Sequence, residues 1–306
     1  MRKDKFDMSY TSEFCKFYNN LKIDVNSEFD VVYHYTSANA LLSILQKREL
    51  RFTDRFYLND KSEGTYVLEL SKENLSELMD DTSLQSEIKK VIDERIASPQ
   101  SGNFYVYQCS CSTDRDNLAL WNYYTKSNDM QGYNIGIRTD KIDNISIPTP
   151  MRDLPVYAGS VIYNRNNQLN KLRQLLERFG NFQREHDPNN AHIVDLARFA
   201  VDKIMMLGIF FKNPYFEVEK EYRIAIVPYI EENGEVYAEI ERKFMERYGI
   251  LIPYFDVAIP NELINGITVS PTMNFETAQK SLQNVLSLST HLRQEDIIAS
   301  KIPVRY

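Results

Sequence analysis

Carboxylates recur at every second position ahead of an arginine within residues 216–229, in the order Glu217, Glu219, Glu221 and Arg223. The stretch alternates in the manner of a β-strand and ends at Pro228, so these odd-numbered positions share one face of the predicted strand. Such a face is either the solvated side of an edge strand or the lining of a site in which at least one carboxylate has a perturbed pKa. The pattern alone leaves both interpretations open.

A histidine on an early predicted strand is the second candidate for chemistry. His34 stands in Tyr33-His34-Tyr35-Thr36, where aromatic rings and hydroxyls flank the imidazole. A lone strand histidine is more often a core residue with satisfied hydrogen bonds than a catalyst. Its neighbours favour a functional role here.

The remaining metal-ligating residue types give no recognisable metal motif. No two of the four histidines are spaced as His-x-x-x-His, and Cys109 and Cys111 are two residues apart. That cysteine spacing suits neither a disulfide framework nor a common zinc motif. We therefore expect no metal, and we expect both cysteines to be small buried side chains. Glycine-rich nucleotide-binding motifs and Gly-x-Ser-x-Gly are absent as well.

Composition is that of a globular protein rather than a nucleic-acid-wrapping or membrane protein. The 306 residues are 43% hydrophobic and 26% charged, with a net charge of −7. This charge gives no broad attraction to nucleic acid, although an aromatic-lined cleft can still accept one single-stranded base. No apolar run is long enough to span a membrane, and no signal peptide stands at the N-terminus, so we expect a cytoplasmic protein.

The elements that must position these residues interleave irregularly, which predicts one α+β domain over residues 1–306. We expect an N-terminal extension over 1–29 and helical insertions over 62–97 and 165–208, the second ending at Gly208. The expected strands cover residues 31–35, 51–53, 104–112, 132–138, 155–163, 216–229, 235–240, 256–259 and 267–270. Shorter helices are expected over 38–45, 114–124 and 275–285.

Three local interpretations accompany these elements. Asp60 and Glu63 have the spacing of a capping box at the start of a helix. Trp121, the only tryptophan, reads as a core anchor. Residues 235–240 are predicted to pair with 216–229 as a hairpin across residues 232–234.

Four short motifs, in this order, resemble the signature of an uncharacterised bacterial domain family. They are His34-Tyr35-Thr36, Asn59-Asp60…Glu63, Leu120-Trp121…Tyr124 and Glu219…Glu221…Arg223. The resemblance extends over residues 31–306. It also includes residues 132–137, Phe211-Lys212 and Ser300-Lys301-Ile302-Pro303.

That family in turn resembles, more distantly, the ADP-ribosyltransferase superfamily of the His-Tyr-Glu type. The resemblance implies a split pair of small β-sheets that clasp NAD, here a substrate. It also implies His34 on the adenosine ribose, Tyr124 stacked on the nicotinamide and Glu221 beneath the reacting ribose carbon. Tyr123 and Tyr35 remain alternatives for Tyr124.

The resemblance assigns further roles around the same dinucleotide. Glu219 would orient or deprotonate the acceptor, and which of Glu217, Glu219 and Glu221 is catalytic stays open. Tyr35 and Thr36 are expected to contact the cofactor. Arg223 is expected to hold a phosphate or to neutralise the carboxylates, and a cross-strand ion pair is an equal alternative.

The expected function is NAD-dependent mono-ADP-ribosyl transfer to RNA, DNA or protein by a bacterial toxin or anti-phage defence effector. Its partners would be NAD, the macromolecular acceptor, which includes single-stranded RNA or DNA, and a neutralising antitoxin protein. The alternatives are an NAD glycohydrolase, in which water is the acceptor, and a non-catalytic interaction or sensor module on the same scaffold.

Overall fold

The computed structural model describes residues 8–23, 28–60, 62–98, 104–125, 130–231, 235–286 and 292–304. Within these residues the chain combines α-helices with strands that join in one open mixed sheet. It divides into two compact units. The helical unit comprises Met1–Asp24, Ser62–Gly102 and Ile162–Pro214, and the sheet unit comprises Val25–Lys61, Asn103–Val161 and Tyr215–Tyr306.

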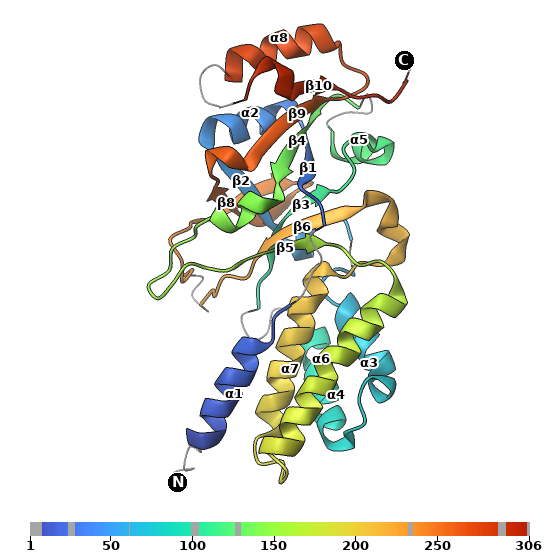
Figure 1. Ribbon diagram of the computed structural model, residues 1–306, viewed down its shortest axis with the longest axis vertical. Helices are drawn as coiled ribbons and strands as arrows, with labels where there is room; N and C mark the ends of the chain where they lie inside the picture. The colour runs from blue at the N-terminus through green and yellow to red at the C-terminus, as the bar shows by residue number, and fades with distance from the viewer. Residues whose placement is uncertain are drawn as a thin grey trace. The chain divides into compact units, whose positions relative to one another are not determined.

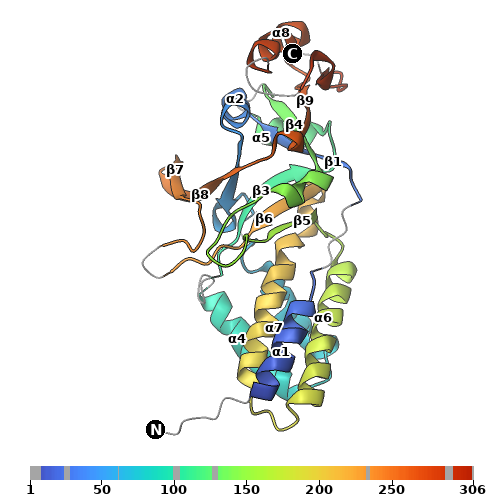
Figure 2. The same ribbon diagram turned by 60° about the vertical axis from the view of Figure 1, so that its left-hand side comes forward.

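The helical unit contains the N-terminal helix and both predicted helical segments. Its elements are α1 (Met8–Asn20), α3 (Tyr66–Leu78), α4 (Thr82–Ala97), α6 (Arg165–His186), α7 (Ile193–Leu207) and η4 (Gly208–Phe210). Figure 2 shows α1, α6 and α7 running alongside one another. The helices expected in residues 62–97 and 165–208 are therefore confirmed.

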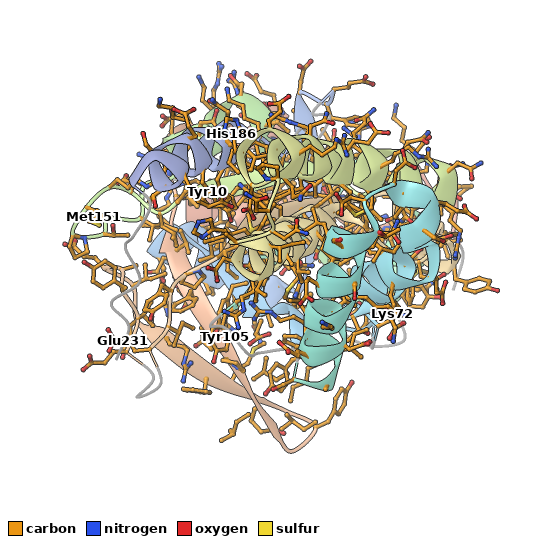
Figure 3. The ribbon with its side chains drawn as sticks, turned by 90° about the horizontal axis from the view of Figure 1, so that it is seen from below. Tyr10, Lys72, Tyr105, Met151, His186 and Glu231 are labelled. Atoms are coloured by element: carbon orange, nitrogen blue, oxygen red, sulfur yellow. The ribbon has the colours of Figure 1, made fainter. Side chains whose placement is uncertain are left out.

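Aromatic rings join α1 to α6. Tyr10 meets Phe182 edge-on with ring centroids 5.8 Å apart, and Phe17 meets Phe179 at 5.1 Å. Figure 3 labels Tyr10 on α1 and His186 at the end of α6, where the two helices lie side by side. Rings at such distances stabilise the contact beyond their buried area.

Gly208 stands where α7 ends, as predicted, but for a reason other than a left-handed backbone. Its φ of −62° is ordinary for any residue. A Cβ at this position would lie 2.3 Å from Val67 Cγ1 and 2.8 Å from Val67 Cβ on α3. Glycine is therefore required here because the two helices approach closely.

We predict that Gly208→Ala destabilises the protein by about 1–3 kcal/mol, because the added methyl group overpacks this contact. Adding Val67→Ala should restore part of the loss. Gly180→Ala is the matched control, since its Cβ would meet nothing nearer than 3.5 Å inside α6, and it should be neutral or stabilising. Urea unfolding of the variants checks this, and equal midpoints for Gly208→Ala and Gly180→Ala would contradict it.

The sheet unit holds the ten strands found among the described residues. They are β1 (Val31–Thr36), β2 (Glu49–Asp54), β3 (Tyr107–Ser112), β4 (Tyr133–Arg138), β5 (Val156–Ser160), β6 (Glu221–Ile226), β7 (Arg242–Arg247), β8 (Ile250–Ala258), β9 (Ile264–Val269) and β10 (Ile297–Ala299). Its helices are α2 (Ala38–Lys47), α5 (Leu118–Tyr124) and α8 (Phe275–Leu286). Short 3₁₀ turns are η1 (Arg55–Tyr57), η3 (Thr139–Asn144), η5 (Pro214–Glu219), η6 (Asn261–Leu263) and η7 (Gln294–Asp296).

The strand order is β10-β9-β4-β1-β3-β2-β8-β7, with β6 also paired to β3 and β5 paired to β6. Among the pairs of described strands, β10–β9 alone is parallel. β1 matches β4 over six register pairs, whereas it matches β3 at the single pair Tyr33–Ser112, which we call the seam. In Figure 1, β4 stands nearly upright while β5 and β6 cross the view. The strands therefore form one sheet and not two separate sheets. Its two parts, β10-β9-β4-β1 on one side and β3-β2-β8-β7 with β6 and β5 on the other, are joined at this single pair.

Strand alternation gives the sheet an apolar face and a polar face. The apolar face carries Val32, Cys109 and Tyr222, which pack with side chains of α2 and α8 in the main core. Directly paired residues share a face, so Tyr33–Ser112 and Ser112–Glu221 place Tyr33, Ser112 and Glu221 together on the opposite, polar face. Ser110 and Arg223, which are also paired, lie there too.

The stretch at residues 216–229 is only partly a strand. Residues 214–219 form η5, Lys220 has a φ of 44°, and β6 begins at Glu221. Every residue of β6 is buried, so the interpretation of this stretch as a solvated edge strand is wrong. The strand lies between β3 and β5, which cover both of its edges.

Three smaller expectations also need correction. Residues 235–240 form no strand, but the predicted pairing is present in part, as an antiparallel bridge between Ile230 and Val236 and a hydrogen bond from the Tyr237 N–H to the Tyr229 carbonyl. The turn at 232–234 lies outside the described residues. The capping box is wrong because α3 begins at Tyr66, well after Asp60. The sequence reading also missed β7, an outer strand whose apolar side chains are largely exposed.

A buried carboxylate closes β2. Asp54 is 2% exposed, and its Oδ1 accepts a 3.0 Å hydrogen bond from the Phe56 backbone N–H. Burial raises the pKa of Asp54 to about 6, against the opposing effects of that hydrogen bond, Arg55 and Arg242. Between the ordinary and the raised pKa the folded chain binds more protons than the unfolded chain.

Asp54 should therefore cost stability as the pH rises from about 4 to about 6. We predict that Asp54→Asn, which keeps the accepting oxygen, removes this loss and is up to about 3 kcal/mol more stable than the wild type at neutral pH. Urea unfolding across this pH range measures the difference. Asp143→Asn, at an exposed carboxylate, is the control, and parallel pH profiles for wild type and Asp54→Asn would refute the prediction.

Candidate active site

Three polar side chains from distant parts of the chain meet in the sheet unit. Asn59 follows η1, Tyr124 ends α5 and Glu219 ends η5. Asn59 Nδ2 donates to the Tyr124 hydroxyl at 2.9 Å and lies 3.3 Å from Glu219 Oε1. The Tyr124 hydroxyl in turn donates to Glu219 Oε1 at 3.3 Å. Three of the four sequence motifs thus contribute one residue each to a single hydrogen-bonded group.

The backbone of η5 is fixed by side chains from the neighbouring segment. Asn117 Nδ2 donates to the Val218 carbonyl, and Ser112 Oγ donates to the Glu219 carbonyl, both at 2.8 Å. Asn117 also caps α5, since its Oδ1 accepts from the Ala119 N–H at 3.0 Å. One residue therefore sets both the helix that carries Tyr124 and the turn that carries Glu219.

Lys220 makes the turn between the two candidate glutamates. Its φ of 44° is unusual for a residue with a side chain, and its N–H donates to the Glu217 carbonyl at 3.1 Å. Because the backbone turns here, Glu219 and Glu221 are not consecutive same-face residues of one strand. Glu219 joins Asn59 and Tyr124, whereas Glu221 lies on the polar face of the sheet.

Glu221 belongs to a buried charged group on β3 and β6. Ser110 Oγ donates to its Oε1 at 2.6 Å, and Arg223 Nη2 donates to its Oε2 at 2.8 Å. Glu221 is 4% exposed and Arg223 is fully buried. Arg223 therefore forms an ion pair, but with a residue two apart on its own strand and not across strands, as the alternative interpretation had it.

Tyr124 links the two carboxylates electrostatically. Burial of its hydroxyl, followed by the negative charges of Glu219 and Glu221, raises the pKa of Tyr124 above its usual range. The phenol therefore stays protonated near neutral pH and remains a hydrogen-bond donor. Tyr123, the alternative to Tyr124, is 69% exposed, and Tyr124 is the residue that contacts Glu219.

His34 is separated from these residues by the sheet itself. Tyr33 shares the polar face with Ser112 and Glu221, so its neighbour His34 lies on the apolar face. There His34 Nδ1 lies 2.9 Å from the Ser110 carbonyl and 3.6 Å from Cys109 Sγ. The structure thus brings Tyr124, Glu219 and Glu221 together but does not bring His34 to the same face.

The pKa values of His34 and Cys109 are shifted by each other. Burial opposes the imidazolium, but the charge and hydrogen bond of Cys109, with the Ser110 carbonyl, raise the pKa of His34 to about 9. The hydrogen bond from Cys111, together with the charge of His34, lowers the pKa of Cys109 well below its ordinary value. The two cysteines are buried, as expected, and Cys15 is exposed.

Tyr35 and Thr36 are buried, and Tyr35 fixes the segment that leads into α5. The Tyr35 hydroxyl donates to the Asp114 carbonyl and accepts from the Asn117 N–H, both at 2.9 Å. Its ring meets Trp121 edge-on at 4.7 Å. Trp121 is fully buried, which confirms the predicted core anchor.

Asp116 explains why the motif near the C-terminus accompanies the tryptophan helix. Its carboxylate accepts from Trp121 Nε1 at 2.9 Å, Ser300 Oγ at 2.6 Å and the Lys301 N–H at 2.5 Å. The segment around Ser300 is thereby fixed next to α5. Neither link was visible from the sequence, because hydroxyl and carboxylate partners far apart in a chain leave no periodic signal.

Sequence reasoning missed the roles of Ser110 and Asn117. Alternation along residues 107–112 marks Ser110 as facing away from the cysteines, but nothing in that pattern pairs it with Glu221. Asn117 stands directly before an apolar helix, a position typical of an N-cap. Its second hydrogen bond, to Val218, depends on a segment about a hundred residues away.

One family model matches the chain. Residues 120–224 match the family described as Protein of unknown function (DUF2971). The match covers about a third of the chain, from the tryptophan helix through Arg223. It supports the resemblance to an uncharacterised domain family. No curated protein and no solved structure matches the chain.

No helix among the described residues is both long and apolar enough to cross a lipid bilayer.

We predict that Arg223→Met destabilises the protein by about 3–5 kcal/mol, because it leaves the Glu221 carboxylate buried without its guanidinium. The double variant Glu221→Gln/Arg223→Met should lose less than the two single variants together. Urea unfolding of the four proteins measures this coupling. Arg138→Met, which breaks the exposed pair with Asp140, should change little, and additive effects at 221 and 223 would contradict the prediction.

Proposed function

We propose that the protein is an NAD-dependent mono-ADP-ribosyltransferase that modifies a macromolecule. The observation that carries the proposal is the meeting of Asn59, Tyr124 and Glu219 within the electrostatic reach of Glu221. Three motifs of the resembled family supply these residues. Hydrogen-bonded carboxylates beside a protonated phenol suit a reaction that develops positive charge on a sugar.

The sheet offers a second line of support. The resemblance implies two small sheets that clasp NAD, and the sheet here narrows to one register pair at Tyr33–Ser112. Ser112, on the seam, also holds the Glu219 carbonyl. An ADP-ribosyltransferase-like core, with the seam at the place of the split, is therefore part of the proposal.

Breaking the bond between nicotinamide and ribose leaves a cationic ribose carbon, and each glutamate has a distinct role in that step. Glu221 would stabilise the cation and accept a hydrogen bond from the ribose 2′-hydroxyl, the kind of bond that it accepts from Ser110 in this structure. Glu219 would orient or deprotonate the acceptor. Its carboxylate is held in place by Asn59 and Tyr124.

Tyr124 would stack on the nicotinamide, and Arg223 would neutralise Glu221 before NAD binds. Tyr124 is 38% exposed, so part of the residue is accessible to a ligand. His34 would not contact NAD, because it lies on the apolar face of the sheet. The acceptor class remains RNA, DNA or protein, and the resemblance favours a toxin or an anti-phage defence effector restrained by an antitoxin.

The decisive experiment incubates the purified protein with adenylate-labelled NAD and cell lysate, with and without nuclease or protease. We expect released nicotinamide and labelled macromolecule. Glu221→Gln should lower the rate by about 10²–10³-fold, since it removes about 2.7–4 kcal/mol of transition-state stabilisation. Glu217→Gln, an exposed glutamate on the same turn, is the matched control and should keep the wild-type rate.

Each of the other possible outcomes would lead to a different conclusion. Nicotinamide release without labelled macromolecule would indicate an NAD glycohydrolase. Intact NAD under every condition would overturn the enzymatic proposal and leave a binding module. Equal rates for Glu221→Gln and Glu217→Gln would remove Glu221 from the chemistry even if transfer occurs.

A further inference from the structure

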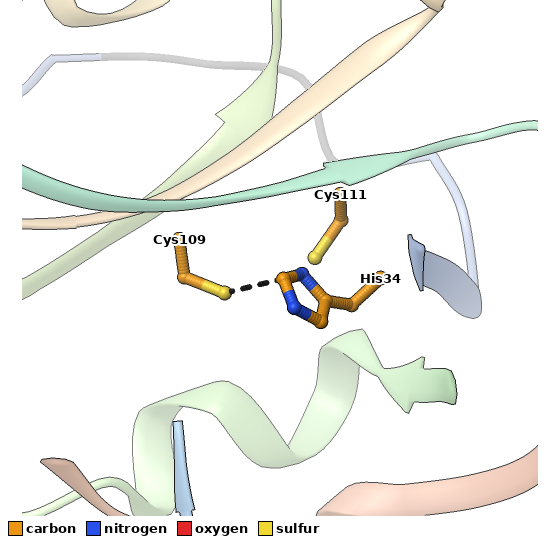
Figure 4. A group of neighbouring side chains, drawn as sticks. All are labelled: His34, Cys109 and Cys111. Carbon is orange, nitrogen blue, oxygen red and sulfur yellow. Dashed lines mark hydrogen bonds between the residues drawn. The ribbon is translucent and has the colours of Figure 1, made fainter. Parts of the chain in front are cut away.

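Two thiols and an imidazole converge on the apolar face of the sheet, away from the candidate active site. Cys109 and Cys111 are two apart on β3, so both side chains leave the same face. β1 is the neighbouring strand across the seam, and it brings His34 beneath them, as Figure 4 shows. One ligand atom from each residue lies within 4.8 Å of the other two.

The spacing of these atoms matches that of zinc ligands. Zinc binds thiolate sulfur at about 2.3 Å and imidazole nitrogen at about 2.0–2.1 Å, so in a tetrahedral site nitrogen and sulfur lie about 3.6 Å apart. His34 Nδ1 and Cys109 Sγ are separated by 3.6 Å. All three atoms lie within 4.8 Å of one another, close enough to surround one ion once the His34 ring turns.

Other uses of the cluster fit the geometry less well. Residues two apart on a strand are separated by roughly 6.6 Å, whereas a disulfide needs Cβ atoms about 3.8 Å apart. A Cys109–Cys111 disulfide would therefore require β3 to distort. Thiolates also disfavour Mg²⁺ and Ca²⁺, which prefer oxygen ligands.

We propose that His34, Cys109 and Cys111 bind one zinc ion, with the fourth position open to solvent. Among the residues that the structure describes, no further histidine, cysteine or carboxylate joins the group. His34 is only partly buried and forms the accessible side of the site. The site is independent of the proposed transferase activity, because Glu219 and Glu221 do not take part in it.

Zinc binding would replace protons rather than oxidise any group. The two thiols and the imidazole together give up two protons to solvent, so that zinc binds two thiolates and a neutral imidazole. Nδ1 cannot both donate to the Ser110 carbonyl and bind the metal. Zinc binding therefore breaks this contact, and the imidazole ring turns toward the two sulfurs.

The test uses the full chain, freed of metal by a chelator and titrated with Zn²⁺ against a chromophoric zinc indicator. We expect one tightly bound zinc per chain, and Co²⁺ in its place should give a thiolate-to-cobalt charge-transfer band. Cys109→Ser, Cys111→Ser and His34→Gln should lose the stoichiometric binding. Cys15→Ser, at the exposed cysteine of α1, is the matched control and should retain both binding and band.

A second measurement on the unaltered chain covers variants that fail to fold. Zinc should protect two of the three thiols from alkylation, and peptide mapping should identify them as Cys109 and Cys111. Wild-type protein that binds no zinc, or binds it equally well after Cys109→Ser and Cys111→Ser, would overturn the proposal. Cobalt binding without the charge-transfer band would overturn it as well.

Discussion

The buried pair of Glu221 and Arg223 constrains the rest of the sheet unit. A carboxylate and a guanidinium held inside a protein need hydrogen-bonding partners from every direction, because no water replaces those that are missing. β3 therefore carries Ser110 at the position paired with Arg223, where its hydroxyl reaches Glu221. The same requirement separates the sheet into two faces, since the opposite side of these strands is filled by aliphatic and sulfur-containing residues.

The two faces carry groups of different chemistry, and only the thickness of the sheet separates them. Ser110 belongs to both, because its hydroxyl contacts Glu221 on the polar face and its carbonyl accepts from His34 on the apolar face. A change at one group can therefore reach the other through a single residue of β3. Asn59, Tyr124 and Glu219 come from turns and a helix end around the polar face, which are easier to vary than the strands that carry Glu221 and Arg223.

Most helices could be predicted from the sequence, because their apolar residues recur with helical spacing. Leu172, Leu176 and Phe179 define the buried side of α6, and Ala197, Val201 and Ile204 that of α7. The strands near the N-terminus could also be predicted from the spacing of their apolar residues. Apolar alternation is weaker in β7, where the side chains face solvent on both sides, and that strand was missed.

The candidate site was predictable by residue type and less so by position. Tyr124, Glu219, Glu221 and Arg223 do gather in one region, and Asn59 joins them from the motif that had suggested a helix cap. The sequence could not show that His34 lies on the face opposite Glu221, because one strand of sequence does not tell which of its faces is polar. The register with β3 decides that question, and register depends on partners about eighty residues away.

At Lys220, a single backbone angle changes how the two acids of the Glu-x-Glu motif are placed. In an extended Glu-x-Glu segment the two acids stand at a fixed separation, as equivalent members of one row. With a left-handed residue between them, each acid acquires its own surroundings: one is anchored in a turn, the other in a strand. The backbone at Lys220 thereby gives two identical side chains different hydrogen-bond partners.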